Sequence, residues 1–281
     1  MASFDFDQAE GLRRMLAGPK PRVVTFLSTM PASDKSAMLV NLGASLAQAG
    51  SDVLLVDACG GLDGIASHLG AVNGMTLQHV ARQECSLDQV VNKMPQGFGL
   101  VELNRCTVRP ARPLPDQSRR VNHAFDILVK RSGIVLVDGE SGGDDDDEPF
   151  PLPLMASSEI VLQVSASAGS IKGAYSVIKM LSSQLGRRPF SILVTGASEN
   201  EAKVVYDNMA QAASRYLAVQ LNSVGSVPAD EHLNKAARLG RTVVDAFPLA
   251  GASVAFRRLA GRFVLPVAQG ARTMDGARFG T

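Results

Sequence analysis

A lysine and a serine stand side by side at Lys35 and Ser36, in the segment STMPASDKSAMLVNLG (28–43). A phosphate-binding loop ends on such a pair, because it needs a cation for the phosphates and a hydroxyl group for Mg²⁺. The loop also needs glycines, so that successive backbone N–H groups can wrap the phosphates. Pro31, Ala32 and Asp34 occupy the loop instead. Taken alone, the pair favours an ordinary capped surface helix.

Two aspartates end apolar runs farther along the chain, Asp57 in DVLLVDA and Asp138 in GIVLVDG. These runs are continuously apolar rather than alternating, which indicates strands of a parallel sheet covered on both faces. The strands predicted in this way are 23–28, 52–58, 133–139, 159–165, 190–196 and, more weakly, 221–227. Helical patterns separate them over 36–49, 170–185 and 230–239. The chain therefore predicts an α/β fold with a doubly wound, mostly parallel sheet and helices on both faces. In such a fold, ligands bind beyond the carboxyl ends of the strands.

Composition narrows the class of protein. The 281 residues suffice for one large domain, and 28 basic against 27 acidic residues leave a net charge of +1. That balance gives no whole-molecule argument for nucleic acid, and none is expected as a partner. Three scattered cysteines fit a reducing compartment, and neither a signal peptide nor an apolar run of roughly 18 residues is visible. These features predict a cytoplasmic protein.

Longer segments around the Lys-Ser pair carry a family resemblance. VNLGASLAQAGSDVLLVDAC (40–59) resembles the segment that follows the deviant phosphate loop of the ParA/MinD family of P-loop proteins. GIVLVDG resembles the Walker B strand of that family, with Asp138 at the metal-associated aspartate. The similarity continues in order to about residue 265. It implies a site for ATP or ADP formed by Lys35, Ser36, Asp57 and Asp138, with Mg²⁺ at Ser36 and Asp138.

Several departures from the family pattern bear on catalysis. The signature lysine that reaches across a dimer falls on Met30, the water-associated aspartate on Cys59, and an adenine-reading asparagine on Thr195. Phosphoryl transfer is catalysed by positioning and charge, and a single arginine-finger-type group is worth roughly 10³–10⁵ in rate. Losing several such groups together should remove hydrolysis. The resemblance therefore implies a pseudo-ATPase with a degenerate Walker A motif, in which nucleotide binding is doubtful.

A short motif at the N-terminus resembles one subfamily. DQAEGLR (7–13) matches the DQAxxLR motif of the flagellar number regulators called FlhG or FleN, and SIKGAYSVIKML (170–181) resembles a helix of theirs. In that subfamily the motif engages a signal-recognition-type GTPase of the FlhF kind. The residues that would contact it here are Asp7, Gln8, Ala9, Leu12 and Arg13. By itself the motif is an ordinary amphipathic helix.

The resemblance implies a regulator of flagellar number and placement that acts through protein partners. Flagellar switch components, a transcription regulator, a second copy of the chain and the inner membrane surface are the other expected partners. We predict a partner-binding helix and linker over 1–20, a P-loop domain over 21–266 and a flexible tail over 267–281.

Two alternative functions remain open at this stage. The retained Lys35, Ser36 and Asp138 are compatible with an active ATP-dependent dimerisation switch, and the fold also serves other P-loop enzymes. The segment 254–265 is either a basic amphipathic membrane helix or the last packed helix of the domain. Asp144–Asp147 lack EF-hand spacing and are expected to form a solvated acidic loop.

Overall fold

The computed structural model describes residues 21–59, 64–71, 74–104, 115–140, 150 and 152–264. Within them an eight-stranded sheet has the order β3-β4-β2-β5-β1-β6-β7-β8. All neighbours are parallel except β3, which runs antiparallel to β4. The strands are β1 (Arg22–Ser28), β2 (Val53–Asp57), β3 (Asn92–Lys93), β4 (Gly99–Glu102), β5 (Ile134–Asp138), β6 (Glu159–Val164), β7 (Phe190–Thr195) and β8 (Leu221–Val227).

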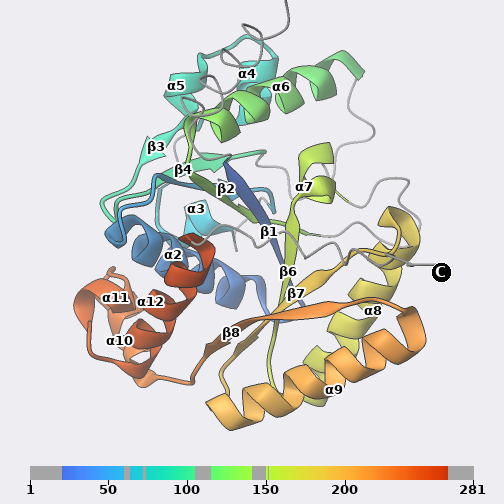
Figure 1. The fold of residues 1–281 in the computed structure, drawn as a ribbon. Coiled ribbons are helices and arrows are strands. Elements are labelled where there is room, and N and C mark those ends of the chain that lie inside the picture. The colour runs from blue at the N-terminus through green and yellow to red at the C-terminus, as the bar shows by residue number, and fades with distance from the viewer. Residues whose placement is uncertain are drawn as a thin grey trace, which may run out of the picture.

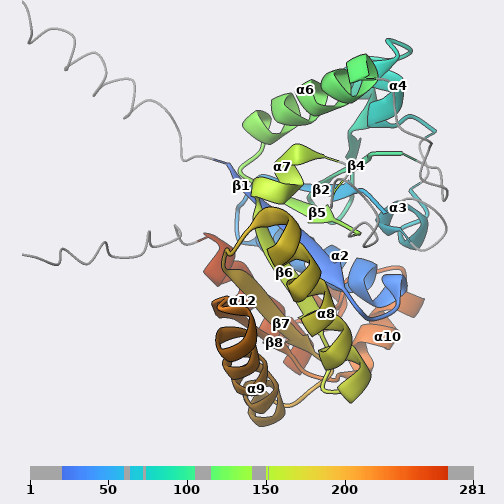
Figure 2. The same ribbon diagram turned by 90° about the vertical axis from the view of Figure 1, so that its right-hand side faces the viewer.

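Helices cover both faces of the sheet (Figures 1 and 2). One face carries α4 (Leu77–Ala81), α5 (Leu87–Val90), α6 (Pro115–Arg131), α7 (Pro153–Ser157), α8 (Ala168–Leu185) and α9 (Glu199–Leu217). The other carries α2 (Ala32–Gln48), α3 (Ile65–His68), α10 (Glu231–Arg238), α11 (Val243–Ala246) and α12 (Gly251–Val264). The predicted doubly wound α/β architecture is therefore confirmed.

Burial explains which strands the sequence predicted well. All residues of β2, β5 and β7 are buried, because helices cover both of their faces. The weaker predicted strand is the edge strand β8, in which Asn222 and Ser223 are exposed. The sequence analysis did not predict β3 and β4, which contain two and four residues. A run of four residues carries too little pattern to be distinguished from a loop.

The predicted helix over 36–49 is wrong at its start, because α2 begins four residues earlier, at Ala32. Glycines would favour an open loop here, but the chain has Ala32, Ser33 and Asp34, which are compatible with a helical first turn. Asp34 also places a carboxylate in the first turn, where the helix dipole favours negative charge. Pro153 occupies the first position of α7, where its missing N–H costs nothing.

The apolar face of α12 decides between the two readings of residues 254–265. Phe256, Leu259, Ala260 and Phe263 are all buried in the core shared with α2 and β1, and only Val264 of the predicted face is exposed. This segment is therefore the last packed helix of the domain. Across the described residues, no helix is both long and apolar enough to cross a bilayer.

Candidate functional site

Acidic side chains from three neighbouring strands meet at the carboxyl edge of the sheet. Asp57 ends β2 and is paired in register with Asp138 at the end of β5 and with Glu102 at the end of β4. All three are buried. The structure therefore brings the two aspartates predicted from sequence side by side, and it adds Glu102, which was missed because β4 was not predicted.

Lys35 reaches this edge from the first turns of α2. Its Nζ lies 2.7 Å from Asp138 Oδ1 and donates to the carbonyl oxygen of Gly139 at 2.6 Å. The side chain is 4% exposed, so the ion pair is almost completely removed from water. Burial by itself lowers the pKa of Lys35, but the charge of Asp138 and the contact with Cys59 outweigh it, and the pKa is raised. Lys35 is therefore a cation whose charge is already compensated within the chain.

Ser36 binds the same carboxylate. Its Oγ donates to Asp138 Oδ2 at 3.1 Å, so one carboxyl group receives Lys35 on one oxygen and Ser36 on the other. A hydroxyl and a carboxylate are ligands that Mg²⁺ accepts, and Ser36 and Asp138 are the residues here that would hold it. In the described part of the chain, no three His, Cys, Asp or Glu side chains form a group of their own that could hold a metal.

The loop before Lys35 does not have the form of a phosphate cradle. The amides of Asp34 and Lys35 donate to Pro31 O, at 3.0 and 3.4 Å, and so form the first turn of α2. In a phosphate loop such amides face the phosphates instead. The exposed carboxylate of Asp34 adds a negative charge beside them. The residues present therefore do not fit the phosphates of a nucleotide, although Ser36 and Asp138 have the right chemistry for its metal.

Cys59 completes the contacts of Lys35. Its Sγ accepts from Lys35 Nζ at 3.2 Å and lies 3.3 Å from both Asp138 O and Asp138 Oδ1. Burial and the charge of Asp138 raise the pKa of this thiol strongly, so it stays protonated. Cys59 is thus a neutral neighbour of the ion pair, and it carries no negative charge at the position where the family has an aspartate.

Asp57 has a different role from Asp138. Its Oδ2 accepts from the backbone N–H of Ala66 at 3.0 Å, at the start of α3. Gly64 passes so close that a Cβ there would lie 2.4 Å from Asp57 Oδ2. The carboxylate therefore binds the first turn of α3, and its predicted role in nucleotide binding stays a prediction.

The other two departures from the family pattern contact each other. Thr195 Oγ1 donates to Met30 Sδ at 3.4 Å and accepts from Gln163 Nε2 at 3.2 Å. Gln163 was missed by the sequence analysis, although it is the only uncharged polar residue within the buried run 159–164 and that position could have marked it. The thioether of Met30 thus packs back against the end of β7.

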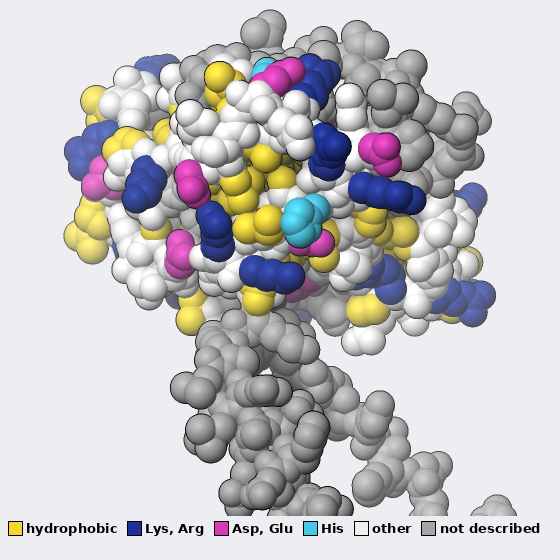
Figure 3. Space-filling model, turned by 90° about the horizontal axis from the view of Figure 1, so that it is seen from above, with side chains coloured by type: hydrophobic (Ala, Val, Ile, Leu, Met, Phe, Trp, Pro, Cys, Tyr) yellow, Lys and Arg dark blue, Asp and Glu magenta, His cyan; other side chains and the backbone are white. Residues whose placement is uncertain are grey.

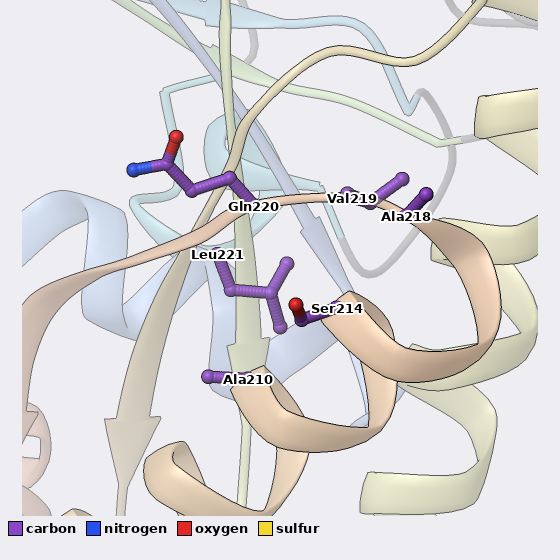
Figure 4. Close-up of a pocket in the computed structure, with 6 residues that line it drawn as sticks. All are labelled: Ala210, Ser214, Ala218, Val219, Gln220 and Leu221. Carbon is purple, nitrogen blue, oxygen red and sulfur yellow. The ribbon is translucent and has the colours of Figure 1, made fainter.

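One cavity adjoins this cluster, since the first turn of α2 and Thr195 line it, and a second cavity lies away from it. The first, of about 440 Å³, is formed between α2 and α10, beyond the ends of β7 and β8. The other, of about 470 Å³, lies between the last turns of α9 and the start of β8, and its walls are short or uncharged side chains (Figure 4). The second cavity is at the opposite edge of the sheet from Asp138 and has no charged group to bind a nucleotide.

Several predicted residues lie outside the described ranges. They are the partner-binding residues Asp7, Gln8, Ala9, Leu12 and Arg13, together with the aspartate run 144–147. On the face of the molecule that Figure 3 shows, Lys and Arg side chains are scattered among acidic, apolar and uncharged ones.

The sheet order and the convergence of Lys35, Ser36 and Asp138 define an α/β protein of the P-loop NTPase fold. Solved structures agree with this class. MinD of Pyrococcus horikoshii, complexed with Mg-ADP, is 16% identical, with a TM-score of 0.62 over 87% of this chain and 96% of that one. MinD in the MinC:MinD complex of Aquifex aeolicus is 20% identical, also with a TM-score of 0.62, over 88% and 98%.

Sequence comparison narrows the class. The antiactivator FleN of Pseudomonas aeruginosa is 32% identical over 227 residues, which cover 80% of this chain and 80% of FleN. No family model matches the chain. The chain belongs to the ParA/MinD family of P-loop proteins, in which it is a FlhG/FleN-like member.

Proposed function

We propose that the protein is a regulator of flagellar number and placement that acts through protein partners and does not hydrolyse ATP. The similarity to the antiactivator FleN and the DQAEGLR motif support the regulatory role. The observation that carries the loss of hydrolysis is the loop before Lys35, whose amides donate to Pro31 O.

The chemistry of the site supports this proposal. Hydrolysis needs charge directed at the transferring phosphoryl group, and the ammonium of Lys35 is already held by Asp138 and Gly139. Met30 supplies no charge at the position of the signature lysine, and Cys59 is a protonated thiol. A nucleotide would have to break the buried ion pair, unwind the first turn of α2 and displace Asp34 before its phosphates were held.

Calorimetric titration with Mg-ATP tests this proposal. We expect no saturable heat at millimolar nucleotide for the parent protein. The matched variant is Met30→Lys with Pro31→Gly, Ala32→Gly and Asp34→Gly, which restores the loop glycines and the signature lysine. If this variant binds Mg-ATP and the parent protein does not, the loop is the cause of the lost nucleotide binding. Submillimolar binding by the parent that is lost in a folded Lys35→Ala variant, together with release of phosphate from the bound ATP, would contradict the proposal.

That contrary result would favour an ATP-dependent dimerisation switch. The specific observation in favour of the switch is the contact of both Lys35 and Ser36 with Asp138, which keeps the three groups of an ATP site together. In that case ATP and Mg²⁺ would bind at Lys35, Ser36, Asp57 and Asp138. ATP-dependent dimers, seen by light scattering, would accompany the binding heat.

We propose that residues 7–13 contact a signal-recognition-type GTPase of the FlhF kind. The full-length chain should change the turnover of that GTPase, and a Leu12→Ala/Arg13→Ala variant should lose most of this effect. Arg187→Ala, an exposed arginine on the domain itself, is the control. Equal effects from both variants, or no effect of the parent, would count against this contact. We also propose flagellar switch components, a transcription regulator, a second copy of the chain and the membrane surface as partners. Pull-down assays test the proteins, light scattering tests the dimer, and sedimentation with lipid vesicles tests the membrane surface.

A further inference from the structure

The cavity between α2 and α10 is lined by both apolar and polar side chains. Its volume is about 440 Å³, and its apolar lining includes Met38, Leu69, Leu233 and Phe256. Ser33 and Asp34, from the first turn of α2, also line it, together with Thr195. This mixed lining suits a ligand with an aliphatic part and a polar end.

The charge of the lining is negative. Asp34 is exposed and makes no ion pair with any residue that the structure describes. Arg241 also lines the cavity, but its Nε lies 2.7 Å from Asp245 Oδ2, so its charge is already compensated. The remaining titratable group is His68, and burial lowers its pKa, which keeps the imidazole neutral. The groups that line the cavity therefore leave one uncompensated negative charge, that of Asp34.

A hydrogen-bond acceptor in the wall also lacks a donor. Gln96 lines the cavity, and its Oε1 is buried with no hydrogen-bond partner among the described residues. A buried acceptor without a donor costs about 1–3 kcal/mol, and a ligand that donates would recover part of this cost. The carboxylate of Asp34 and the amide oxygen of Gln96 both accept hydrogen bonds, and neither would bind a phosphate.

We propose that this cavity binds an aliphatic chain that ends in a guanidinium or ammonium group. The methylene stem would pack on Met38, Leu69 and Leu233, as long basic side chains do on apolar surface, and the cation would pair with Asp34. The inference rests on the proposed function in one respect, namely that Mg-ATP does not occupy this cavity, which includes Thr195 at the position of the adenine-reading asparagine.

Two sources share this chemistry, a free amine and a lysine or arginine side chain of a protein partner. Agmatine represents the first, and the peptide acetyl-Ala-Arg-Ala-amide represents the second. Amide NMR of the full-length protein follows both probes. The signals of Gly196 and Gly240, which line the cavity, should shift and saturate. Tighter binding of agmatine indicates that the natural ligand is a free amine. Tighter binding of the peptide indicates that it is a lysine or arginine side chain of a protein partner.

Two variants test the site. Asp34→Asn should weaken the favoured probe about three- to fivefold, as expected for a partly exposed ion pair. Ala237→Phe, which places a ring in the cavity, should weaken it more than tenfold. Asp207→Asn is the control, because it removes an exposed carboxylate from α9, away from the cavity. A thermal melt shows whether each variant is folded.

The outcomes separate this inference from the proposed function. Absence of saturable shifts with both probes at 10 mM overturns the inference and leaves the proposed function intact. Shifts that neither Asp34→Asn nor Ala237→Phe changes also overturn it. Hydrolysis of Mg-ATP that depends on Lys35 overturns the proposed function, whether or not the amines bind. If either probe binds saturably, if both cavity variants weaken that binding and if Mg-ATP does not bind, the inference and the proposed function are both supported.

Discussion

Asp138 and Asp57 occupy equivalent positions on neighbouring strands and have different partners. They are paired in register at the ends of β5 and β2, and their residues are 0% and 3% exposed. Asp138 receives the ammonium of Lys35 and the hydroxyl of Ser36, whereas Asp57 accepts a backbone N–H from Ala66. Equal burial therefore does not mean equal function. The first carboxylate compensates a buried charge, and the second accepts a backbone N–H in the first turn of α3.

The largest expected effect comes from removing the carboxylate that compensates a charge. Asp138→Ala leaves Lys35 buried without its counter-charge, which should lower the free energy of unfolding by about 3–5 kcal/mol. Urea unfolding followed by circular dichroism measures this loss. The matched control is Lys35→Met/Asp138→Leu, in which both charges are replaced by apolar groups and much of the stability should return. A loss below about 1 kcal/mol in the single variant would show that the pair is not buried as described.

Removing the carboxylate of Asp57 should lower the free energy of unfolding by less than removing that of Asp138. Asp57→Ala takes a hydrogen-bond acceptor from the buried N–H of Ala66, which should lower the free energy of unfolding by about 1–3 kcal/mol. Asp57→Asn keeps an acceptor oxygen and should lose less than the alanine variant. The same urea experiment measures both. If Asp57→Ala cost as much as Asp138→Ala, the contrast between the two aspartates would be wrong.

The smallest expected effect is the pH dependence of the Asp138 cluster. The pKa of Cys59 is raised in the folded state, so the folded protein keeps a proton that the unfolded chain releases above about pH 8.5. The contribution of Cys59 is therefore fully present below that pH and is lost as pH rises, by up to about 1.4 kcal/mol per pH unit. Lys35, whose pKa is also raised, adds a similar loss only at higher pH, above the ordinary lysine value.

Urea unfolding between pH 8 and 10 measures this slope. Cys59→Ser should flatten it, because the serine hydroxyl does not titrate in this range. Cys85→Ser is the comparison: that cysteine lies outside the cluster, and because burial and the charge of Glu84 raise its pKa as well, its removal should flatten the slope less than Cys59→Ser does. An unchanged slope in Cys59→Ser would show that the thiol does not sit beside Asp138.

The sequence predicted the main strands well because each is a run of apolar residues buried on both faces. It also identified Lys35, Ser36 and Asp138, since the segments around them resemble those of one family. The start of α2 could not be predicted in the same way. The helical pattern of apolar residues places the helix start at Ser36, but the residues before it are compatible with a start at Ala32, and the hydrogen bonds to Pro31 O show that the helix begins there.

The hydrogen-bond partners of the buried groups could not be predicted from the sequence, for a related reason. Lys35 and Gly139 are 104 positions apart, and the carbonyl oxygen of Gly139 has no side-chain signature. Glu102 and Gln163 were missed because β4 is too short to predict and a single polar residue in an apolar run does not reveal its neighbour. Such contacts depend on which strands lie side by side.

By itself, the sequence determined the α/β class, the family and the loss of the loop glycines, because these depend on residue types in order along the chain. Only the tertiary structure decided what the remaining site residues do. The order of the strands places Asp138 between Lys35 and Ser36, and turns Asp57 towards α3. It also buries the apolar face of α12. The physical reason is that charge compensation and burial depend on distances in space, which a linear pattern does not contain.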